Sequence, residues 1–237
     1  MQRYFSENKK NNQLILNKDD LHHIKKVMRM KDNDLIEVVY ENKVFICKLS
    51  EINSDIKINI ISEEEDVQKD KLEVTLIIPL LKENKMDIIL QKATELGVKR
   101  IIPVITERSI IKLDEKKETK KQERWVKICK EASEQSKRVD IPIVSEVMNF
   151  KQLELLEGDK IVCSTSEKDN NIRLYLKNNK MCDKINVVIG PEGGLSKREE
   201  DLLVEIGFKP VSLGKRIMRV ETVPLFILSV LNYEYME

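Results

Sequence analysis

From about residue 71 onward, short apolar runs of strand length alternate with longer stretches of helical periodicity. The apolar runs lie at residues 74–80, 101–105, 161–163, 185–189 and 211–213. Stretches with apolar residues on one helical face follow Asn84, Thr119 and Ser196, each of which can cap a helix N-terminus. Because strands that alternate with helices favour a parallel sheet, this part of the chain is predicted to form an α/β domain.

The first 70 residues have a different pattern. Alternating apolar runs lie at residues 35–39, 44–49 and 56–61. Strands of this length and spacing indicate a small β-barrel, and Asn33 and Asn42 fall where its turns are expected. A polar, acidic interval at residues 63–70 is predicted to be a linker. We therefore expect two domains, a β-barrel at residues 1–70 and an α/β domain at residues 71–237.

Two unusual loops follow strands of the second domain. Residues 190–194 read Gly-Pro-Glu-Gly-Gly, and residues 214–222 read Gly-Lys-Arg-Ile-Met-Arg-Val-Glu-Thr. Ligands of open parallel sheets bind beyond the carboxyl ends of the strands, so the two loops would face one crevice if their strands are neighbours. Gly193 and Gly194 leave the backbone bare for contact with a flat ligand, although a Gly-Gly pair is also typical of a tight turn. The charged residues of the second loop lie among apolar ones, which favours a binding site over a plain connection.

Taken together, the two loops resemble the cofactor-binding end of the RsmE-type ribosomal RNA small subunit methyltransferases. These SPOUT-superfamily enzymes methylate N3 of a uridine in 16S ribosomal RNA. Met218 and Val223 stand where the family more often has Leu and Ala. The resemblance implies an N-terminal PUA-like β-barrel that binds RNA and a SPOUT-type α/β domain with a C-terminal trefoil knot. It also implies S-adenosyl-L-methionine as cofactor, and 16S ribosomal RNA or the assembled small ribosomal subunit as partner.

Other functions share parts of this pattern. A non-catalytic RNA-binding protein of ribosome assembly could use the same barrel, and a SPOUT methyltransferase could act on another RNA target. A nucleotide hydrolase with a phosphate loop at residues 190–194 is disfavoured, because the loop lacks the Gly-Lys-Ser/Thr ending and no Asp is placed for Mg²⁺. Binding of S-adenosyl-L-methionine would separate the methyltransferase from the RNA-binding protein.

The resemblance also assigns candidate residues for the chemistry. Methyl transfer depends mainly on positioning, and a fixed cation can stabilise the anion that forms when uracil N3 loses its proton. Arg219 and Arg138 are the candidate catalytic cations. Glu221 is the candidate proton acceptor, or alternatively a carboxylate that orients Arg219. The candidate cofactor-binding residues are Thr165, Ser166, Glu167, Gly190, Pro191, Gly193, Gly194, Leu213, Gly214, Ile217, Met218 and Arg219.

Basic residues at residues 20–30, which read as a short helix, are the first candidates for RNA contact. Lys25, Lys26 and Arg29 lie there without an intervening acid, a pattern that also suits an ordinary solvated face. The resemblance favours RNA binding, since the family has a His followed by a Val-Leu-Arg-like triplet in this helix and a Gln-Ser-x-Arg motif, here at residues 135–138, at the end of a later one. The candidate RNA-binding residues are Arg3, His22, Lys25, Lys26, Arg29, Arg108, Gln135 and Arg138.

Charge and cysteine usage limit the function classes. The 42 Lys and Arg nearly balance the 41 Asp and Glu, so a protein that coats nucleic acid with its whole surface is excluded. The 4 cysteines lack Cys-x-x-Cys spacing, and we expect reduced thiols and no metal. Because no apolar run reaches the length of a membrane span and no secretory signal is visible, a cytoplasmic protein without a membrane partner is expected.

The last predicted helix is unusually apolar. Residues 223–231 are apolar except for Ser229, Thr222 can cap the helix, and Pro224 lies in its first turn. A helix that is apolar on every side is expected to be buried on every side. One small sheet cannot cover all of it, so part is expected to face a second copy in a two-fold homodimer. In the family the active site lies near that interface, where residues 135–138 of the partner would help to meet the RNA.

Overall fold

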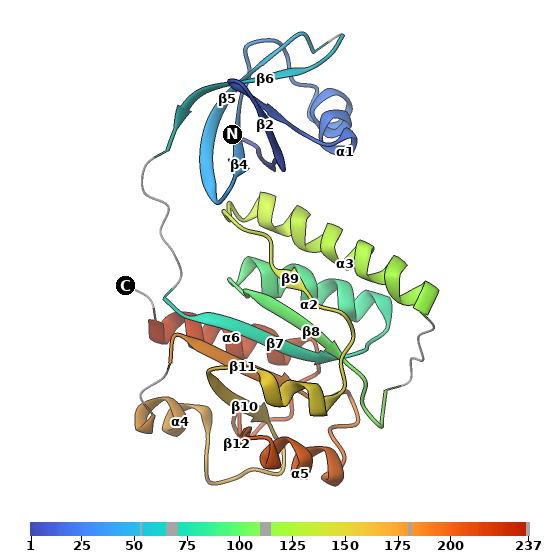
Figure 1. The fold of residues 1–237 in the computed structure, drawn as a ribbon. Helices are drawn as coiled ribbons and strands as arrows, with labels where there is room; N and C mark the ends of the chain where they lie inside the picture. The colour runs from blue at the N-terminus through green and yellow to red at the C-terminus, as the bar shows by residue number, and fades with distance from the viewer. Residues whose placement is uncertain (53, 65–70, 110–114, 180–181, 236–237) are drawn as a thin grey trace. The chain divides into compact units, whose positions relative to one another are not determined.

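The computed structural model describes residues 1–52, 54–64, 71–109, 115–179 and 182–235. The chain divides into two compact units, each built from two segments. Unit 1 combines Met1–Lys69 with Lys130–Ile141, and unit 2 combines Asp70–Cys129 with Pro142–Glu237. The colours of Figure 1 trace these segments along the chain.

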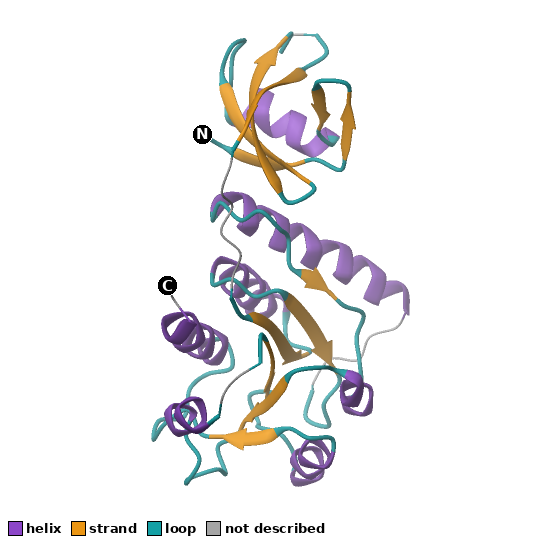
Figure 2. Ribbon diagram, turned by 60° about the vertical axis from the view of Figure 1, so that its left-hand side comes forward, coloured by secondary structure: helices purple, strands orange, loops and turns teal. Residues whose placement is uncertain are grey.

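Unit 1 contains a six-stranded sheet in the order β1-β4-β5-β6-β3-β2. Among the described strands of this unit, only β1 and β4 pair in parallel, and the strands curl into a barrel-like sheet beside the first helix (Figure 2). The turns use Asn as predicted, since Asn33 and Asn42 have φ angles of 75° and 59°. The strands are β1 (Arg3–Phe5), β2 (Asn8–Lys10), β3 (Gln13–Ile15), β4 (Leu35–Tyr40), β5 (Lys43–Ser50) and β6 (Lys57–Glu63).

The helix of unit 1 differs in its limits from the predicted one at residues 20–30. It begins as α1 (Lys18–His22) and continues as a π-helical stretch, η1 (His23–Val27). The side chain of Asn17 caps it by accepting from the backbone N of Asp20 at 2.9 Å. Ile24 is fully buried, so this helix closes the barrel-like core. That core consists of Tyr4, Leu14, Leu16, Ile24, Ile36, Val38, Phe45, Cys47, Leu49, Ile52 and Ile58.

Ion pairs fasten the segment Lys130–Ile141 into unit 1. Lys130 Nζ lies 2.5 Å from Oδ1 of Asp20, and Lys137 Nζ lies 2.9 Å from Oε2 of Glu37. Arg3 Nε donates to the same Oε2 at 2.8 Å. No local pattern in the sequence indicates that this segment belongs to the first unit, and the division into domains at residue 70 stays a prediction.

Unit 2 is built on a six-stranded parallel sheet in the order β12-β10-β11-β7-β8-β9. The predicted α/β class with a parallel sheet is confirmed. Strands β11 and β12, which precede the two unusual loops, are not neighbours, because β10 lies between them and pairs with both. The strands are β7 (Glu73–Pro79), β8 (Arg100–Val104), β9 (Ile143–Val144), β10 (Asp159–Cys163), β11 (Lys184–Ile189) and β12 (Lys209–Val211).

Helices lie on both sides of this sheet (Figure 2). One face packs against α5 and η2 through a core that includes Leu203, Phe150 and Leu153, while α2 and α6 contact each other. The helices are α2 (Glu83–Glu95), α3 (Glu115–Gln135), η2 (Phe150–Leu155), α4 (Ile172–Asn178), α5 (Lys197–Glu205) and α6 (Thr222–Tyr235).

The structure confirms one predicted helix cap and contradicts two others. The capping box of Ser196 and Glu199 is confirmed at the start of α5. The predicted caps Asn84 and Thr119 are wrong, since α2 begins at Glu83 after Lys82 and α3 is already helical at Glu115. An acid in the first turn, such as Glu83, stabilises a helix start through the macrodipole without a side-chain cap.

The apolar helix α6 is only partly covered within the chain. Ile227, Leu228 and Leu231 are fully buried, whereas Phe226 is 37% exposed and Tyr233 is 79% exposed. One side of α6 is therefore uncovered within the single chain, and the expectation that this side faces a second copy stays a prediction. The trefoil knot stays a prediction. No helix in the described ranges is both long enough and apolar enough to cross a membrane.

Candidate functional site

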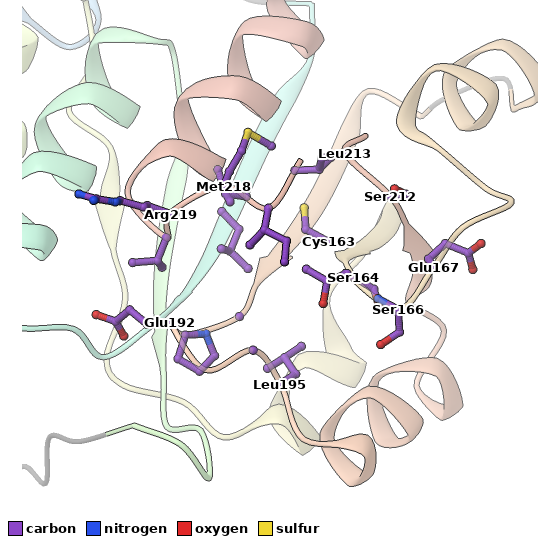
Figure 3. Close-up of a pocket in the computed structure, with 18 of the residues that line it drawn as sticks. Cys163, Ser164, Ser166, Glu167, Glu192, Leu195, Ser212, Leu213, Met218 and Arg219 are labelled. Atoms are coloured by element: carbon purple, nitrogen blue, oxygen red, sulfur yellow. The ribbon is translucent and has the colours of Figure 1, made fainter. Parts of the chain in front are cut away.

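A pocket of about 1180 Å³ opens at the carboxyl ends of the unit 2 strands (Figure 3). Its walls are the loops that follow β10, β11 and β12, with single contributions from the segments after β7 and β8. Parallel strands end at one edge of a sheet, which is why loops far apart in sequence meet here. Every candidate cofactor-binding residue lines the pocket: Thr165, Ser166, Glu167, Gly190, Pro191, Gly193, Gly194, Leu213, Gly214, Ile217, Met218 and Arg219. That they bind a cofactor stays a prediction.

The loop after β10 is ordered by its own polar groups. Ser164 Oγ donates to Glu200 Oε1 at 2.9 Å and accepts from the backbone N of Ser166 at 3.1 Å. Glu167 accepts from the backbone N of Asn170 at 2.9 Å and of Asp169 at 2.8 Å, and these bonds lower its pKa. The Glu167 carboxylate therefore holds its own loop as an anion. Beneath the loop, burial raises the pKa of the Cys163 thiol to about 12, so this pocket residue is not a thiolate.

The Gly-Pro-Glu-Gly-Gly loop turns tightly after β11. The backbone N of Gly194 donates to Pro191 O at 2.8 Å, and Gly194 has a φ angle of +70°, which favours glycine. A Cβ atom on Gly193 would lie 3.3 Å from Cδ of Arg108. Nη1 of Arg108 donates to the carbonyl oxygen of Gly193 and lies 3.5 Å from that of Leu195. The bare backbone at Gly193 is thus approached by Arg108 of the same chain.

Four charged residues gather at one end of the pocket. Lys85 Nζ donates to Glu192 Oε1 at 2.8 Å and lies 3.8 Å from Glu221 Oε2. The hydrogen bond raises the pKa of Lys85 and lowers that of Glu192. Figure 3 shows Arg219 and Glu192 on the opposite side of the view from Ser166 and Glu167, with Met218 between them. Arg219 is exposed, and the described residues offer its guanidinium no ion pair.

The pocket includes residues that the sequence analysis missed. Lys85, Asn171 and Glu200 contribute polar groups, and Leu195 contributes an apolar one. One signal could have pointed to Lys85, since it lies in the first turn of the helix that follows β7. Helix starts after parallel strands lie at the ligand-binding edge of such sheets.

The candidate RNA-binding residues fall into two groups. Arg108 lines the pocket of unit 2, and the others belong to unit 1. His22, Lys26, Arg29 and Gln135 are exposed, and Lys25 is half-buried.

Two of the arginines in unit 1 are already paired. Arg3 is 7% exposed, with its guanidinium bonded to Glu37 and donating to the carbonyl oxygens of Lys137 and Arg138. Arg138, also a candidate catalytic residue, has a side chain 9% exposed, and its Nη2 donates to Asp140 Oδ1 at 2.9 Å. Neither side chain offers a free cation to RNA in this conformation.

Neither the thiols nor the carboxylates build a metal centre among the described residues, where no group of three or more His, Cys, Asp or Glu side chains is placed to hold an ion. The four cysteines are free. Cys47 and Cys129 are buried, Cys163 is half-buried and Cys182 is exposed.

Comparison with known proteins matches both parts of the chain. Residues 68–232 match the RNA methyltransferase domain family, and residues 16–61 match the RNA methyltransferase PUA domain family. The chain is 36% identical to the ribosomal RNA small subunit methyltransferase E of Bacillus subtilis (strain 168) over 251 residues, covering 99% of this chain and 97% of that protein. The protein of the same name from Aquifex aeolicus (strain VF5) is also 36% identical, over 96% of this chain and 97% of its own length.

Solved structures agree over the same length. A ribosomal RNA small subunit methyltransferase E from Neisseria gonorrhoeae bound to S-adenosyl methionine matches with a TM-score of 0.88 and 28% identity, covering 99% of this chain and 98% of that one. A methyltransferase from Legionella pneumophila in complex with S-adenosyl methionine matches with a TM-score of 0.89 and 28% identity, covering 98% and 96%. The resemblance seen in the two loops is confirmed, and the chain belongs to the ribosomal RNA small subunit methyltransferase E family.

Proposed function

We propose that this protein transfers the methyl group of S-adenosyl-L-methionine to N3 of a specific uridine in 16S ribosomal RNA, with the assembled small subunit as substrate. The observation that carries the proposal is the convergence of three loops, all recognised from their sequence, on one pocket at the carboxyl edge of the parallel sheet. The relatives from Neisseria gonorrhoeae and Legionella pneumophila, which share this fold over nearly the whole chain, were solved with S-adenosyl methionine bound. An rRNA substrate implies action in the cytoplasm.

The residues of the pocket fit this cofactor. Ile189, Leu195, Leu213 and Met218 offer apolar surface to a flat base, and the serine hydroxyls and backbone groups of the surrounding loops offer hydrogen bonds. Pockets for small ligands combine apolar walls with a few placed polar groups in this way. At about 1180 Å³ the cavity has room for a cofactor and for a nucleobase beside it.

The bound cofactor supplies an electrophilic methyl group, so the protein must place the nucleophile and manage its proton. Arg219 is suited to stabilise the negative charge of deprotonated uracil, because its guanidinium is exposed at the pocket and has no ion-pair partner among the described residues. Glu221 is suited to accept the N3 proton, since its Oε2 is buried and accepts no hydrogen bond from any described residue. Lys85 Nζ lies 3.8 Å from that oxygen.

RNA binding is assigned to unit 1 and in part to Arg108. The ion pair between Lys130 and Asp20 joins α1 to the segment Lys130–Ile141, so the basic residues of α1 and η1 and the exposed Gln135 belong to one compact unit. Local basic clusters supply the phosphate contacts that a nearly neutral protein otherwise lacks. Arg3 is withdrawn from this set, because its guanidinium is buried against Glu37.

A homodimer is proposed from the uncovered side of α6. Val223, Phe226, Val230 and Tyr233 recur at helical spacing, and none of them is fully buried in the single chain. Exposed apolar surface of this kind marks an interface. Arg138, held away from the solvent by Asp140 within its own unit, would then serve the site of a partner subunit after that ion pair opens.

The experiment has two parts. Calorimetry with S-adenosyl-L-methionine tests the cofactor site, and a chain that binds none would be the non-catalytic RNA-binding protein. Mapping of methylated bases in ribosomal RNA from cells with and without the gene then tests the target. A uridine in 16S rRNA that loses its N3 methyl group only in the deletion strain supports the proposal, whereas a lost mark in another RNA makes the protein a SPOUT methyltransferase with a different target.

A further inference from the structure

The first turn of α5 touches two of the loops around the pocket and is continuous with a third. Glu199 and Glu200 lie in this turn, shortly after the Gly-Pro-Glu-Gly-Gly loop and after Ser196, which caps α5. Of the two, Glu200 lines the pocket and Glu199 does not. Both carboxylates make contacts that the capping box alone does not require.

Glu199 bridges the loop after β8 to the start of α5. It is 6% exposed, and its two oxygens accept from different backbone groups: Oε1 from the N of Glu107 at 2.7 Å, and Oε2 from the N of Ser196 at 2.7 Å. Both bonds are short and charge-assisted, which is the stronger class of hydrogen bond. Because Glu107 is followed directly by Arg108, the bond to Glu107 sets where the Arg108 side chain starts.

Arg108 completes the link to the glycine loop. Its Nη1 donates to the carbonyl oxygen of Gly193 and lies near that of Leu195. The loop after β8 is itself compact, since Thr106 Oγ1 and Ser109 Oγ lie 2.7 Å apart and the backbone N of Ser109 donates to Thr106 O at 3.0 Å. The hydrogen bond from Glu107 to Glu199 thus fixes a short, ordered segment, and Arg108 of that segment holds the backbone of Gly193.

Glu200 makes the corresponding link to the loop after β10. Its Oε1 accepts from Ser164 Oγ at 2.9 Å, and the same Oγ accepts from the backbone N of Ser166 at 3.1 Å. The loops after β8 and β10 are therefore both tied to one helical turn, and the loop after β11 runs into that turn.

We propose that Glu199 and Glu200 are positioning residues that hold the loops after β8 and β10 against the loop after β11 and so set the shape of the cofactor pocket. The inference rests on the proposed function for the identity of the cofactor. It does not require either carboxylate to touch the cofactor.

The test for Glu199 is Glu199→Gln, which keeps the size of the side chain and leaves one of the two backbone N–H groups without its acceptor. Loss of a hydrogen bond to a charged group is expected to weaken binding of S-adenosyl-L-methionine roughly ten-fold by calorimetry. In steady-state assays the KM for the cofactor should rise while kcat changes little. The matched control is Glu205→Gln, which removes the same charge from an exposed position at the other end of α5 and should leave affinity unchanged.

The test for Glu200 pairs it with Ser164. Glu200→Ala and Ser164→Ala each remove the same hydrogen bond, so their effects on cofactor affinity should not add in the double variant. Glu200→Gln retains an acceptor oxygen and should recover most of the loss. If Glu199→Gln does not fold, this cycle alone decides the proposal, and additive effects overturn it.

Amide hydrogen exchange separates this inference from the proposed function, since it needs no cofactor. Glu199→Gln should speed exchange at the N–H of Glu107 and its neighbours, and Glu205→Gln should not. If the wild-type chain binds no S-adenosyl-L-methionine, the proposed function fails while faster exchange still supports the positioning role. Unchanged exchange, unchanged affinity in Glu199→Gln, or an equal loss in the control overturns it.

Discussion

The buried carboxyl group of Glu134 should make the stability of unit 1 depend on pH in an unusual direction. Glu134 is 9% exposed, and burial raises its pKa from 4.5 to about 7, against the opposing effect of Lys130. Lys130 Nζ lies 2.5 Å from Asp20 Oδ1 but 3.2 Å from Glu134 Oε1, so the ammonium group serves Asp20 first. Since the folded state holds the Glu134 proton more tightly than the unfolded state does, this group stabilises unit 1 fully below about pH 4.5, and the contribution is lost as the pH rises through about 7.

The size of the effect follows from the pKa difference. A rise from 4.5 to about 7 corresponds to roughly 3 kcal/mol, which we reduce to about 2 kcal/mol because nearby solvent partly screens the charge. Glu134→Gln keeps the shape of the side chain and removes the titration. The variant should therefore match the wild type near pH 4 and exceed its free energy of unfolding by about 2 kcal/mol near pH 8.

Hydrogen exchange followed by mass spectrometry is the appropriate measurement, because it reports each unit separately. Peptides from β4 and β5 give the opening free energy of unit 1, and peptides from β10 and β11 serve as the internal reference. Glu7→Gln is the matched control, since Glu7 is exposed in the same unit and the substitution removes the same charge. Parallel pH profiles for the wild type and Glu134→Gln would refute the reasoning.

Three further predictions concern the proposed function. Gly193→Val should weaken binding of S-adenosyl-L-methionine in calorimetry, because even its Cβ would lie 3.3 Å from Arg108, and unchanged affinity would show that the loop does not shape the site. Replacing Lys25, Lys26 and Arg29 together by Gln should reduce the magnitude of the slope of log RNA affinity against log salt concentration by about 2, while cofactor binding stays unchanged. An unaltered slope would show that these residues form an ordinary solvated face. Phe226→Asp should reduce the mass found by light scattering to that of one chain, and a persistent dimer would place the interface elsewhere.

The strands that bear the site could be predicted because each long apolar run in an α/β sheet is itself a local signal. The runs at residues 74–80, 101–105 and 185–189 correspond to β7, β8 and β11. The two-residue strand β9 carries no periodicity to detect. The position of β10 between β11 and β12 also escaped prediction, since sheet order is decided by packing between distant segments and not by any local pattern.

In the candidate site, too, local features could be predicted from the sequence, whereas contacts between distant segments could not. Its glycine and arginine loops could be located from sequence, because parallel strands direct such loops to one edge. Arg3 could not be distinguished from an exposed arginine, since its partner Glu37 is 34 residues away, and Arg138 looked available although Asp140 pairs with it. The links through Glu199 were equally invisible, because a capping box predicts only the bond to Ser196 and not the one to Glu107.

The membership of Lys130–Ile141 in unit 1 bears on how such a protein can evolve and be re-engineered. A fragment that ends near residue 70 would carry Glu37 and Asp20 but leave behind Lys137 and Lys130, two of the cations that neutralise them. A single recombination crossover could therefore not transfer the whole of unit 1, because unit 1 consists of two separate segments of the chain. Exchanging it between relatives would demand three coordinated junctions, near residues 70, 130 and 141, and homologues should accordingly vary in both segments together.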